Sequence, residues 1–523
     1  MSLNFLSVVE WRTLGRRYLF GDNEVILDER RLLVRGEPVA IGARAFDLML
    51  LLIAHRDRVV TKAEMLEHVW PGMVVEESNL TVHVSALRKV LGAQSLATVA
   101  GRGYRFVMPL EVKEPTPVQS PAGPQAQPVE RASLAVLPFV NMSDDPQQEH
   151  FADGLVEDII TTLSKISGLA VIARNSSFAY KGRSVDVRQV ARELGVSHVL
   201  EGSVRKGGSQ IRITAQLIDA SSGAHIWAER YDRTLQDVFT VQDEITLMLA
   251  TELQVQLTEG EQTRLRYSTA HNFEAWSHWV RGLAHYRRAD LTPDGMAPAL
   301  ASWQLADTLD PRSASLNAML GLLHYLDARF GFWSSKEAAI EQGNVRVARA
   351  LSLDPQHPDA HMTRSLLLLL QRQHAQAVAA ARQSLQYGPN AADNAAFAAF
   401  VFADAGLAEE AVSLMHRAIK LCPIHPPFYL GHLGKAYRQS RRLEEATSAF
   451  EAYHRLSPGR GLVDLVILCR QRGQAEEAWR WASVLLASDP KFRIGAWAET
   501  QFCSDRAGLD ADTAALRAAG LPG

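Results

Sequence analysis

The 523-residue chain contains little cysteine and no long hydrophobic run. Its three cysteines, Cys422, Cys469 and Cys503, form no CxxC pair, which argues against a disulfide framework and is typical of a reducing compartment. The longest near-apolar stretches, Ala45–Ala54 and Leu366–Leu370, are far shorter than the roughly 20 residues that a membrane-spanning helix needs. The first basic residues follow the first apolar run, so no signal peptide is predicted. These absences predict a cytoplasmic protein.

The chain also lacks a strong net charge and the motifs of common enzymes. Its 55 lysines and arginines against 58 aspartates and glutamates give a net charge of −3, so any DNA-binding surface must be local. The sequence has no HExxH motif and no nucleophile elbow, and the glycines from Gly202 to Gly208 lack the spacing of a phosphate-binding loop. It therefore predicts neither an enzyme nor a bound cofactor.

Shifts in composition predict several domains. Pro109–Arg131 holds six prolines in a polar stretch, which is typical of an extended linker. Residues 18–108 before it alternate between strand-like and helix-like patterns, and residues 132–259 after it do the same. Residues 271–523 are rich in alanine and leucine and have helical periodicity throughout. The predicted fold class is multidomain: a small α+β domain, a small α/β domain and an all-α array.

The N-terminal domain is predicted to contain short strands, three helices and a hairpin. Phe46–Ile53 places its apolar residues on one face of a first helix, and Thr61 with Glu64 forms a capping box that begins a second. A third helix, Glu76–Leu91, carries an apolar stripe at spacings of three and four and ends at Gly92. The strands are expected at Tyr18–Phe20, Val25–Leu27, Arg31–Val34, Pro38–Ile41, Thr98–Val99 and Tyr104–Val107.

The third helix and the hairpin after it carry local positive charge, with no acidic residue from Ser78 to Leu110. A positive helix fits the major groove, where side chains reach base edges, and a positive hairpin reaches phosphates or the minor groove. Basic residues also release counterions, which supplies much of the affinity. We therefore predict double-stranded DNA as a partner. The predicted contacts are Asn79, Thr81, Val82, Ser85, Arg88, Lys89, Arg102 and Arg105.

Several of these residues also have simpler interpretations. Arg88 and Lys89 fit a solvated helix end that touches no DNA. His83, between apolar neighbours, favours packing or a phosphate contact over metal binding, and Trp70 favours a core position over base stacking. The hairpin glycines are turn residues and do not form a nucleotide-binding loop.

The domain resembles the OmpR/PhoB-type winged-helix output domain, in a branch close to CadC and ToxR. The resemblance rests on Val69–Gly72, Asn79–Leu91 and Thr98–Phe106, which occur in the family's order. It implies that the third helix is the recognition helix and that the hairpin is the wing. Only about 17 residues precede the domain, so aspartyl phosphorylation of a receiver domain is not the expected input. CadC-like proteins follow the winged helix with a membrane helix, and none is predicted here.

The middle segment is predicted to be a small α/β domain with the order β-α-β-α-β-β-β-α. It resembles the TolB N-terminal-like domain, on motifs that include Ala135–Phe139 and Trp227–Asp232. That resemblance implies little about its chemistry. The expected elements are Ser133–Phe139, Phe151–Ile166, Leu169–Ile172, Asp186–Leu194, His198–Arg205, Gln210–Asp219, His225–Asp232 and Val241–Leu253.

An acidic cluster surrounds the first helix of this middle domain. A metal site is one interpretation, but charge that favours the positive helix N-terminus is the stronger one. The residues are Asp144, Asp145, Asp153, Glu157 and Asp158.

The C-terminal segment contains an internal repeat. Prolines that close its helices recur at intervals of 44, 34, 34, 35 and 32 residues, close to the 34-residue tetratricopeptide unit. Leu433, Tyr437, Ala446 and Phe450 also match that repeat. The segment thus resembles about six tetratricopeptide repeats over residues 271–490, with a capping tail and an insertion near Ala328–Ser335. Such arrays bind proteins or peptides on a concave face, although a spacer or dimerisation arm is the alternative. Cys422 and Cys469 are expected to pack in the repeats.

Together these features predict a one-component transcription regulator whose repeats bind an unknown protein, peptide or ligand. A homodimer would place two winged helices on adjacent half-sites. One alternative is a scaffold that does not bind DNA. Another is an enzyme such as a nucleotide cyclase, because cyclases share the middle and C-terminal architecture.

Overall fold

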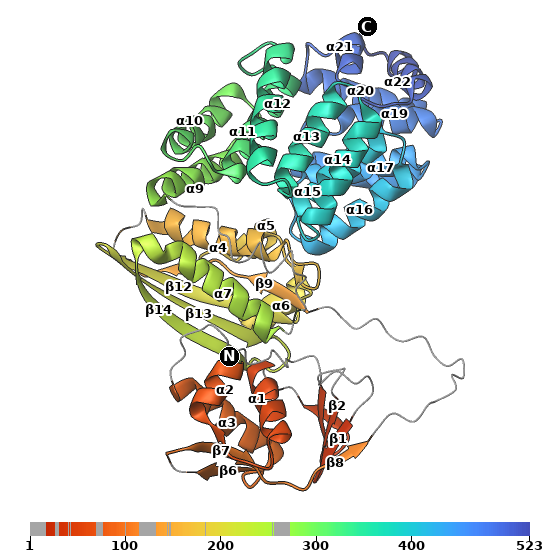
Figure 1. Ribbon diagram of the computed structural model, residues 1–523. Coiled ribbons are helices and arrows are strands. Elements are labelled where there is room, and N and C mark those ends of the chain that lie inside the picture. Colours follow the sequence, from red (N-terminus) through yellow and green to blue (C-terminus); the bar gives the residue numbers. More distant parts are fainter. Residues whose placement is uncertain are drawn as a thin grey trace. The chain divides into compact units, whose positions relative to one another are not determined.

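The computed structural model describes residues 17–26, 31–39, 41, 43–69, 77–99, 101–113, 132–143, 145, 148–183, 185–253, 255 and 272–523. The chain divides into two compact units, shown in Figure 1. Trp70 and most of the predicted proline-rich linker lie outside the described residues. The first unit comprises Met1–Glu130 and Met248–Val255, and the second comprises Arg131–Leu247 and Gln256–Gly523.

The first unit contains an antiparallel sheet of five strands in the order β4-β3-β2-β1-β8. The first four strands form where the sequence predicts them, because turns separate short β-favouring runs. The fifth strand was not predicted: it pairs with the first, with Val112 opposite Tyr18. The strands are β1 (Arg17–Phe20), β2 (Asn23–Ile26), β3 (Arg31–Val34), β4 (Glu37–Val39) and β8 (Glu111–Lys113).

Three helices and a smaller sheet complete this domain; the helices and the hairpin were predicted, and the third strand of the sheet, β5, was not. The sheet has the order β5-β7-β6 and ends in the hairpin of β6 and β7. Phe20 meets Phe106 edge-on at 5.1 Å between ring centroids, and both side chains are buried in the common core. The elements are α1 (Ala43–Ala54), β5 (Val60–Thr61), α2 (Lys62–Val69), α3 (Glu77–Leu91), β6 (Leu96–Val99) and β7 (Gly103–Phe106).

The middle domain has one mixed sheet in the order β11-β9-β12-β13-β14, with β10 also paired to β12. The predicted strand Ser133–Phe139 is shorter than expected, because Pro138 has no N–H to continue the ladder. The helix α5 and the strand β10 were not predicted. The strands are β9 (Ser133–Val136), β10 (Val140–Asn141), β11 (Ala170–Val171), β12 (His198–Gly207), β13 (Gln210–Asp219) and β14 (His225–Thr234).

Four α-helices accompany this sheet. Asp186 caps the third of them by accepting a hydrogen bond from the N–H of Arg188, and Gly195 ends it in a left-handed conformation. Both features were predicted. A short 3-10 turn, η2 (Leu235–Asp237), precedes the last helix. The helices are α4 (Glu149–Leu163), α5 (Arg174–Phe178), α6 (Val187–Leu194) and α7 (Val238–Glu252).

The interpretation of the acidic cluster as charge at the N-terminus of α4 was wrong for Asp153, Glu157 and Asp158, which lie beyond the first turn of the helix. Asp145 precedes the helix, and Asp144 lies outside the described residues. Glu157 forms an ion pair with Arg174 at 3.1 Å and another with Arg287 of the helical array. Asp158 accepts hydrogen bonds from Trp276 Nε1 at 2.6 Å and from Gln242 Nε2 at 2.9 Å. These carboxylates join the middle domain to the array. No group of three or more His, Cys, Asp or Glu side chains with metal-binding geometry occurs among the described residues.

The array consists of consecutive antiparallel helix pairs, as the repeat predicts (Figure 1). Each repeat proline lies two residues after the second helix of its pair, where it cannot continue the helix. The helices are α9 (Phe273–Arg288), α10 (Pro293–Leu309), α11 (Ala314–Phe330), α12 (Lys336–Leu353), α13 (Pro358–Leu370), α14 (His374–Tyr387), α15 (Ala392–Asp404), α16 (Ala408–Leu421), α17 (Phe428–Gln439), α18 (Leu443–Leu456), α19 (Leu462–Gln471), α20 (Ala475–Ser488), α21 (Ile494–Glu499) and α22 (Arg506–Ala518).

The 44-residue interval arises mostly from longer helices. The helices α11 and α12 have 17 and 18 residues, whereas α13 and α14 have 13 and 14. The loop within the predicted insertion, between Phe330 and Lys336, is only slightly longer than the next one. Cys422 and Cys469 are buried, as predicted, and burial raises the pKa of each thiol to about 11.

None of the described helices is both long and apolar enough to cross a membrane.

Candidate nucleic-acid interface

Helix α3 has one buried face and one exposed face. The predicted apolar stripe, Leu80, Val84, Leu87 and Leu91, is buried in the domain core. The opposite face carries exposed side chains that donate, accept or offer methyl groups. Val82 is 63% exposed, so its methyl groups are available for contact with a thymine methyl group. The exposed residues of this face are Thr81, Val82, Ser85, Ala86 and Lys89.

The start of α2 is fixed by the capping box that the sequence predicts. The backbone N–H of Glu64 donates to Thr61 Oγ1 at 3.2 Å, and the backbone N–H of Thr61 donates to Glu64 Oε2 at 2.8 Å. These hydrogen bonds from Thr61 hold the pKa of Glu64 below its usual value, and Arg58 adds to the effect. Thr61 also belongs to β5, so the capping box connects α2 to the sheet that carries the hairpin.

The hairpin of β6 and β7 depends on two glycines for different reasons. Gly101 has a φ of +70°, which L side chains rarely adopt. Gly103 allows a close backbone approach, because a Cβ at that position would collide with the carbonyl oxygen of Val60. Thr61 pairs with Gly103 across the ladder. The hairpin therefore leaves the domain at a fixed position beside α3.

Arg88 links α3 to this hairpin. Its Nε and Nη2 donate to the carbonyl oxygen of Leu96 at 3.2 and 2.8 Å, and Nη2 also donates to Thr98 Oγ1 at 2.6 Å. The guanidinium lies 5.7 Å from the ring centroid of Tyr104. These contacts give Arg88 a structural role, and its predicted contact with DNA stays a prediction.

Three other predicted basic contacts are exposed. Lys89, Arg102 and Arg105 are exposed, and no carboxylate pairs with them among the described residues. The side chain of Asn79 lies outside the described residues. His83 is half-buried, and burial followed by the nearby Arg44 guanidinium lowers its pKa. The imidazole is therefore neutral near pH 7.

The exposed surfaces of α3 and the hairpin together form what we call the basic face: Thr81, Val82, Ser85, Lys89, Arg102 and Arg105. A helix with polar and methyl groups can read base edges in the major groove. The two hairpin arginines can neutralise phosphates next to that groove.

Two family profiles match the chain. Residues 36–106 match "Transcriptional regulatory protein, C terminal". The N-terminal domain is an OmpR/PhoB-type winged helix. Residues 130–248 match "HilA/YgeH-like transcriptional regulator, second domain", so the segment after the winged helix resembles that of another regulator. The resemblance to TolB stays a prediction.

Curated relatives match different portions of the chain. A Rhizobium meliloti protein provisionally named adenylate cyclase 3 is 44% identical over 262 residues, 50% of this chain and 43% of the relative. The chain thus spans less than half of that relative's length. The transcriptional regulator HilA of Salmonella typhi is 23% identical over 420 residues, 78% of this chain and 71% of HilA. The phosphate regulon regulator PhoB of Pseudomonas aeruginosa is 34% identical over 112 residues, 19% of this chain and 49% of PhoB.

Solved structures match individual parts. The DNA-binding domain of Escherichia coli CadC covers 19% of this chain and 98% of its own, with 24% identity and a TM-score of 0.18. Pseudomonas aeruginosa PilF covers 42% of this chain and 93% of its own, with 14% identity and a TM-score of 0.32. The tetratricopeptide assignment of the array rests on its helix pairs and its 34-residue period.

Proposed function

We propose that this protein is a transcription regulator that binds duplex DNA through the basic face of its winged helix. The observation that carries the proposal is the exposed face of α3 beside two exposed hairpin arginines, with no carboxylate neutralising them among the described residues. The match to two regulator families, over residues 36–106 and 130–248, supports the same function.

In this proposal, residues of the basic face contact either base edges or phosphates. Val82, Ser85 and Thr81 lie on the helix and would meet base edges, so they would set sequence preference. Lys89, Arg102 and Arg105 would meet phosphates, so they would set affinity for any duplex. Arg88 would act through the wing, by holding it beside α3.

The test uses duplexes selected by the full chain from a random library, with binding followed by fluorescence anisotropy at several salt concentrations. Replacing Lys89 and Arg102 together with alanine should weaken binding about tenfold or more at 0.1 M salt. The slope of log affinity against log salt should become shallower by about 2, because each phosphate contact contributes roughly −0.9. Arg35→Gln is the matched control, since Arg35 is an exposed arginine in the turn between β3 and β4. Unchanged affinity and slope in the double variant would sink the proposal.

We also propose that the chain is not itself an enzyme, although one relative carries a cyclase name. Both matched families are regulators, and they occupy the N-terminal part of the chain. Incubation of the purified chain with ATP and Mg²⁺ or Mn²⁺ should yield no cyclic nucleotide. Turnover that scales with protein concentration would contradict this proposal.

The array supplies the signal-receiving half of the proposed regulator, by binding a protein or peptide. We expect a cytoplasmic protein, because it must reach chromosomal DNA. We also expect that two copies occupy adjacent half-sites, as dimeric winged helices do. Sedimentation of the chain with and without duplex measures this stoichiometry.

A further inference from the structure

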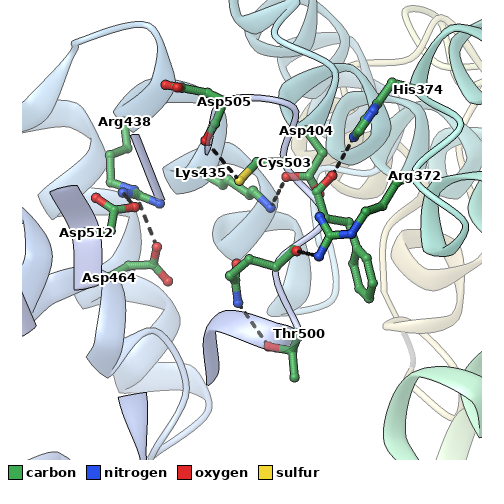
Figure 2. A network of polar contacts seen from close by, with 12 residues as sticks. Arg372, His374, Asp404, Lys435, Arg438, Asp464, Thr500, Cys503, Asp505 and Asp512 are labelled. Atoms are coloured by element: carbon green, nitrogen blue, oxygen red, sulfur yellow. Dashed lines mark hydrogen bonds and ion pairs between the residues drawn. The ribbon is translucent and has the colours of Figure 1, made fainter. Parts of the chain in front are cut away.

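The chain crosses its own array between α21 and α22. The connecting residues Gln501–Asp505, which we call the return segment, are neither helix nor strand. They contact residues from α11 to α15, 100 or more positions earlier in the sequence. Figure 2 shows Arg372 and His374 on one side of this segment and Asp404 with Lys435 on the other.

Backbone hydrogen bonds hold the return segment to the array. Arg372 Nη2 donates to the carbonyl oxygen of Gln501 at 3.0 Å, and His374 Nε2 lies 2.6 Å from that of Phe502. The N–H of Ser504 donates to the carbonyl oxygen of Asp404 at 2.7 Å. Bonds to backbone atoms do not depend on which side chains the bound segment carries. The same groups can therefore bind another extended peptide.

One aromatic side chain anchors the segment. Phe502 is 4% exposed and belongs to the main hydrophobic core of the array. Three cations surround its ring: Arg329 and Lys336 each lie 5.3 Å from the centroid, and Arg372 lies 5.7 Å from it. We call the set that receives the segment the docking face: Arg329, Lys336, Arg372, His374, Asp404 and Lys435.

The return segment leaves part of this docking face unsatisfied. Nη1 of Arg329 and Nη1 of Arg372 are buried without a hydrogen-bond partner among the described residues. No ion pair joins either arginine or Lys336 to a carboxylate in the described part of the chain. By contrast, the buried carboxylate of Asp404 forms an ion pair with Lys435, with 2.6 Å between Oδ1 and Nζ. A ligand with a carboxylate next to its aromatic ring would supply the missing charge-assisted hydrogen bonds.

The helices that flank the return segment have anchors of their own. Asp512 of α22 accepts from Arg438 Nη1 at 2.6 Å and from Gln471 Nε2 at 3.3 Å, and Leu516 is fully buried. The N–H of Ile494, in α21, donates to the carbonyl oxygen of Pro522 at 3.0 Å. The segment can therefore leave the docking face while α21 and α22 stay in place.

We propose that the docking face recognises an extended peptide with an aromatic residue beside a carboxylate, and that the return segment occupies it until such a partner displaces it. This inference rests on the proposed role of the array as a binding region. The tethered segment competes at an effective concentration of about millimolar. In the free chain the return segment therefore excludes weak ligands from the docking face. Only a peptide that forms hydrogen bonds with Arg329 and Arg372 displaces it.

The test uses two fluorescein-labelled peptides that copy residues 498–506 with serine in place of Cys503. One peptide keeps Gln501, and the other has glutamate there, next to the phenylalanine. Phe502→Ala in the full chain should bind the first peptide about tenfold or more tighter than wild type, because the competing anchor is lost. The glutamate peptide should bind this variant about fivefold tighter again. Adding Arg372→Ala should remove both gains.

Thr500→Ala is the matched control and should behave as wild type, because the Thr500 hydroxyl donates to the carbonyl oxygen of Trp497 and accepts only from Gln501 Nε2, and neither contact reaches the docking face. A second readout uses the wild-type chain: the glutamate peptide at about 1 mM should accelerate amide hydrogen exchange in residues 501–505. Equal peptide affinities of wild type and Phe502→Ala, or unchanged exchange, overturn the proposal. Fluorescence anisotropy of labelled DNA with the same preparations measures binding by the winged helix, so the proposed function is tested independently of the docking face.

Discussion

Two neighbouring cations of α3, Arg88 and Lys89, have different surroundings despite identical charge. Arg88 is half-buried and donates to the hairpin backbone, whereas Lys89 is exposed on the basic face. The sequence placed both residues at the end of a positive helix. It could not separate them, because the partner that distinguishes Arg88 is a backbone carbonyl on another element.

Arg88→Ala should lower the free energy of unfolding of the winged helix by about 1–2 kcal/mol, because the bonds to Leu96 and Thr98 are lost. DNA affinity should fall for all duplexes alike, since the hairpin is no longer held. Lys89→Ala is the converse control: its stability should stay within about 0.5 kcal/mol of wild type while its affinity falls. Hydrogen exchange of β6 and DNA anisotropy measure the two effects. If Arg88→Ala reduced affinity without changing β6 exchange, Arg88 would be a direct DNA contact instead.

At the scale of elements, local patterns predicted most of the fold. The apolar stripe of α3, the capping box of α2 and the cap of α6 each depend on residues that follow one another at intervals of at most four positions. The strands that were missed, β5, β8 and β10, depend on distant partners. The strand β8 forms because Glu111–Lys113 pairs with Arg17–Leu19, almost a hundred residues earlier. The helix α5 has only five residues, too few to show a periodic pattern.

Gly103→Ala tests the attachment of the hairpin. The added methyl group would collide with the carbonyl oxygen of Val60, so β5 and β7 must separate. We expect a loss of about 2 kcal/mol or more in stability and weaker DNA binding. Gly101→Ala is the matched control, because its Cβ would meet nothing within 4 Å and only the φ of +70° opposes it. That variant should lose about 1 kcal/mol. Thermal unfolding of the two variants gives the comparison, and equal losses would contradict the close approach at Gly103.

At the scale of the whole second unit, the middle domain is joined to the array by buried charges. Although burial by itself raises the pKa of Glu157, the Arg287 guanidinium outweighs it and holds that pKa below its ordinary value. Burial raises the pKa of Asp158 to about 6. The sequence showed these carboxylates only as an acidic cluster, because Arg287 and Trp276 are more than a hundred residues away.

Asp158 should make the stability of this unit depend on pH. Its folded pKa of about 6 lies above the unfolded value of about 3.9. The stabilisation is therefore fully present below pH 4 and is lost as the pH rises through 6. Asp158→Asn should remove this pH dependence, because the amide does not ionise. The variant should keep the contacts, since its amide oxygen still accepts from Trp276 and Gln242. Melting temperatures of wild type and variant should converge below pH 4 and diverge toward pH 7, with the variant higher. Parallel curves across this range would refute the assignment.

The middle domain holds the array at two separated places. One is α9, through Arg287 and Trp276. The other lies three repeats further on, where Asn390 donates to the carbonyl oxygens of Ile166 and Leu169 and the N–H of Ala173 donates to that of Leu421. Each repeat of such an array contacts mainly its neighbours, so fixing two separated repeats to the same middle domain limits how far the repeats between them can stretch apart. A force that stretches the array would first have to break one of these two sets of contacts with the middle domain. The array would therefore extend in a step and not gradually.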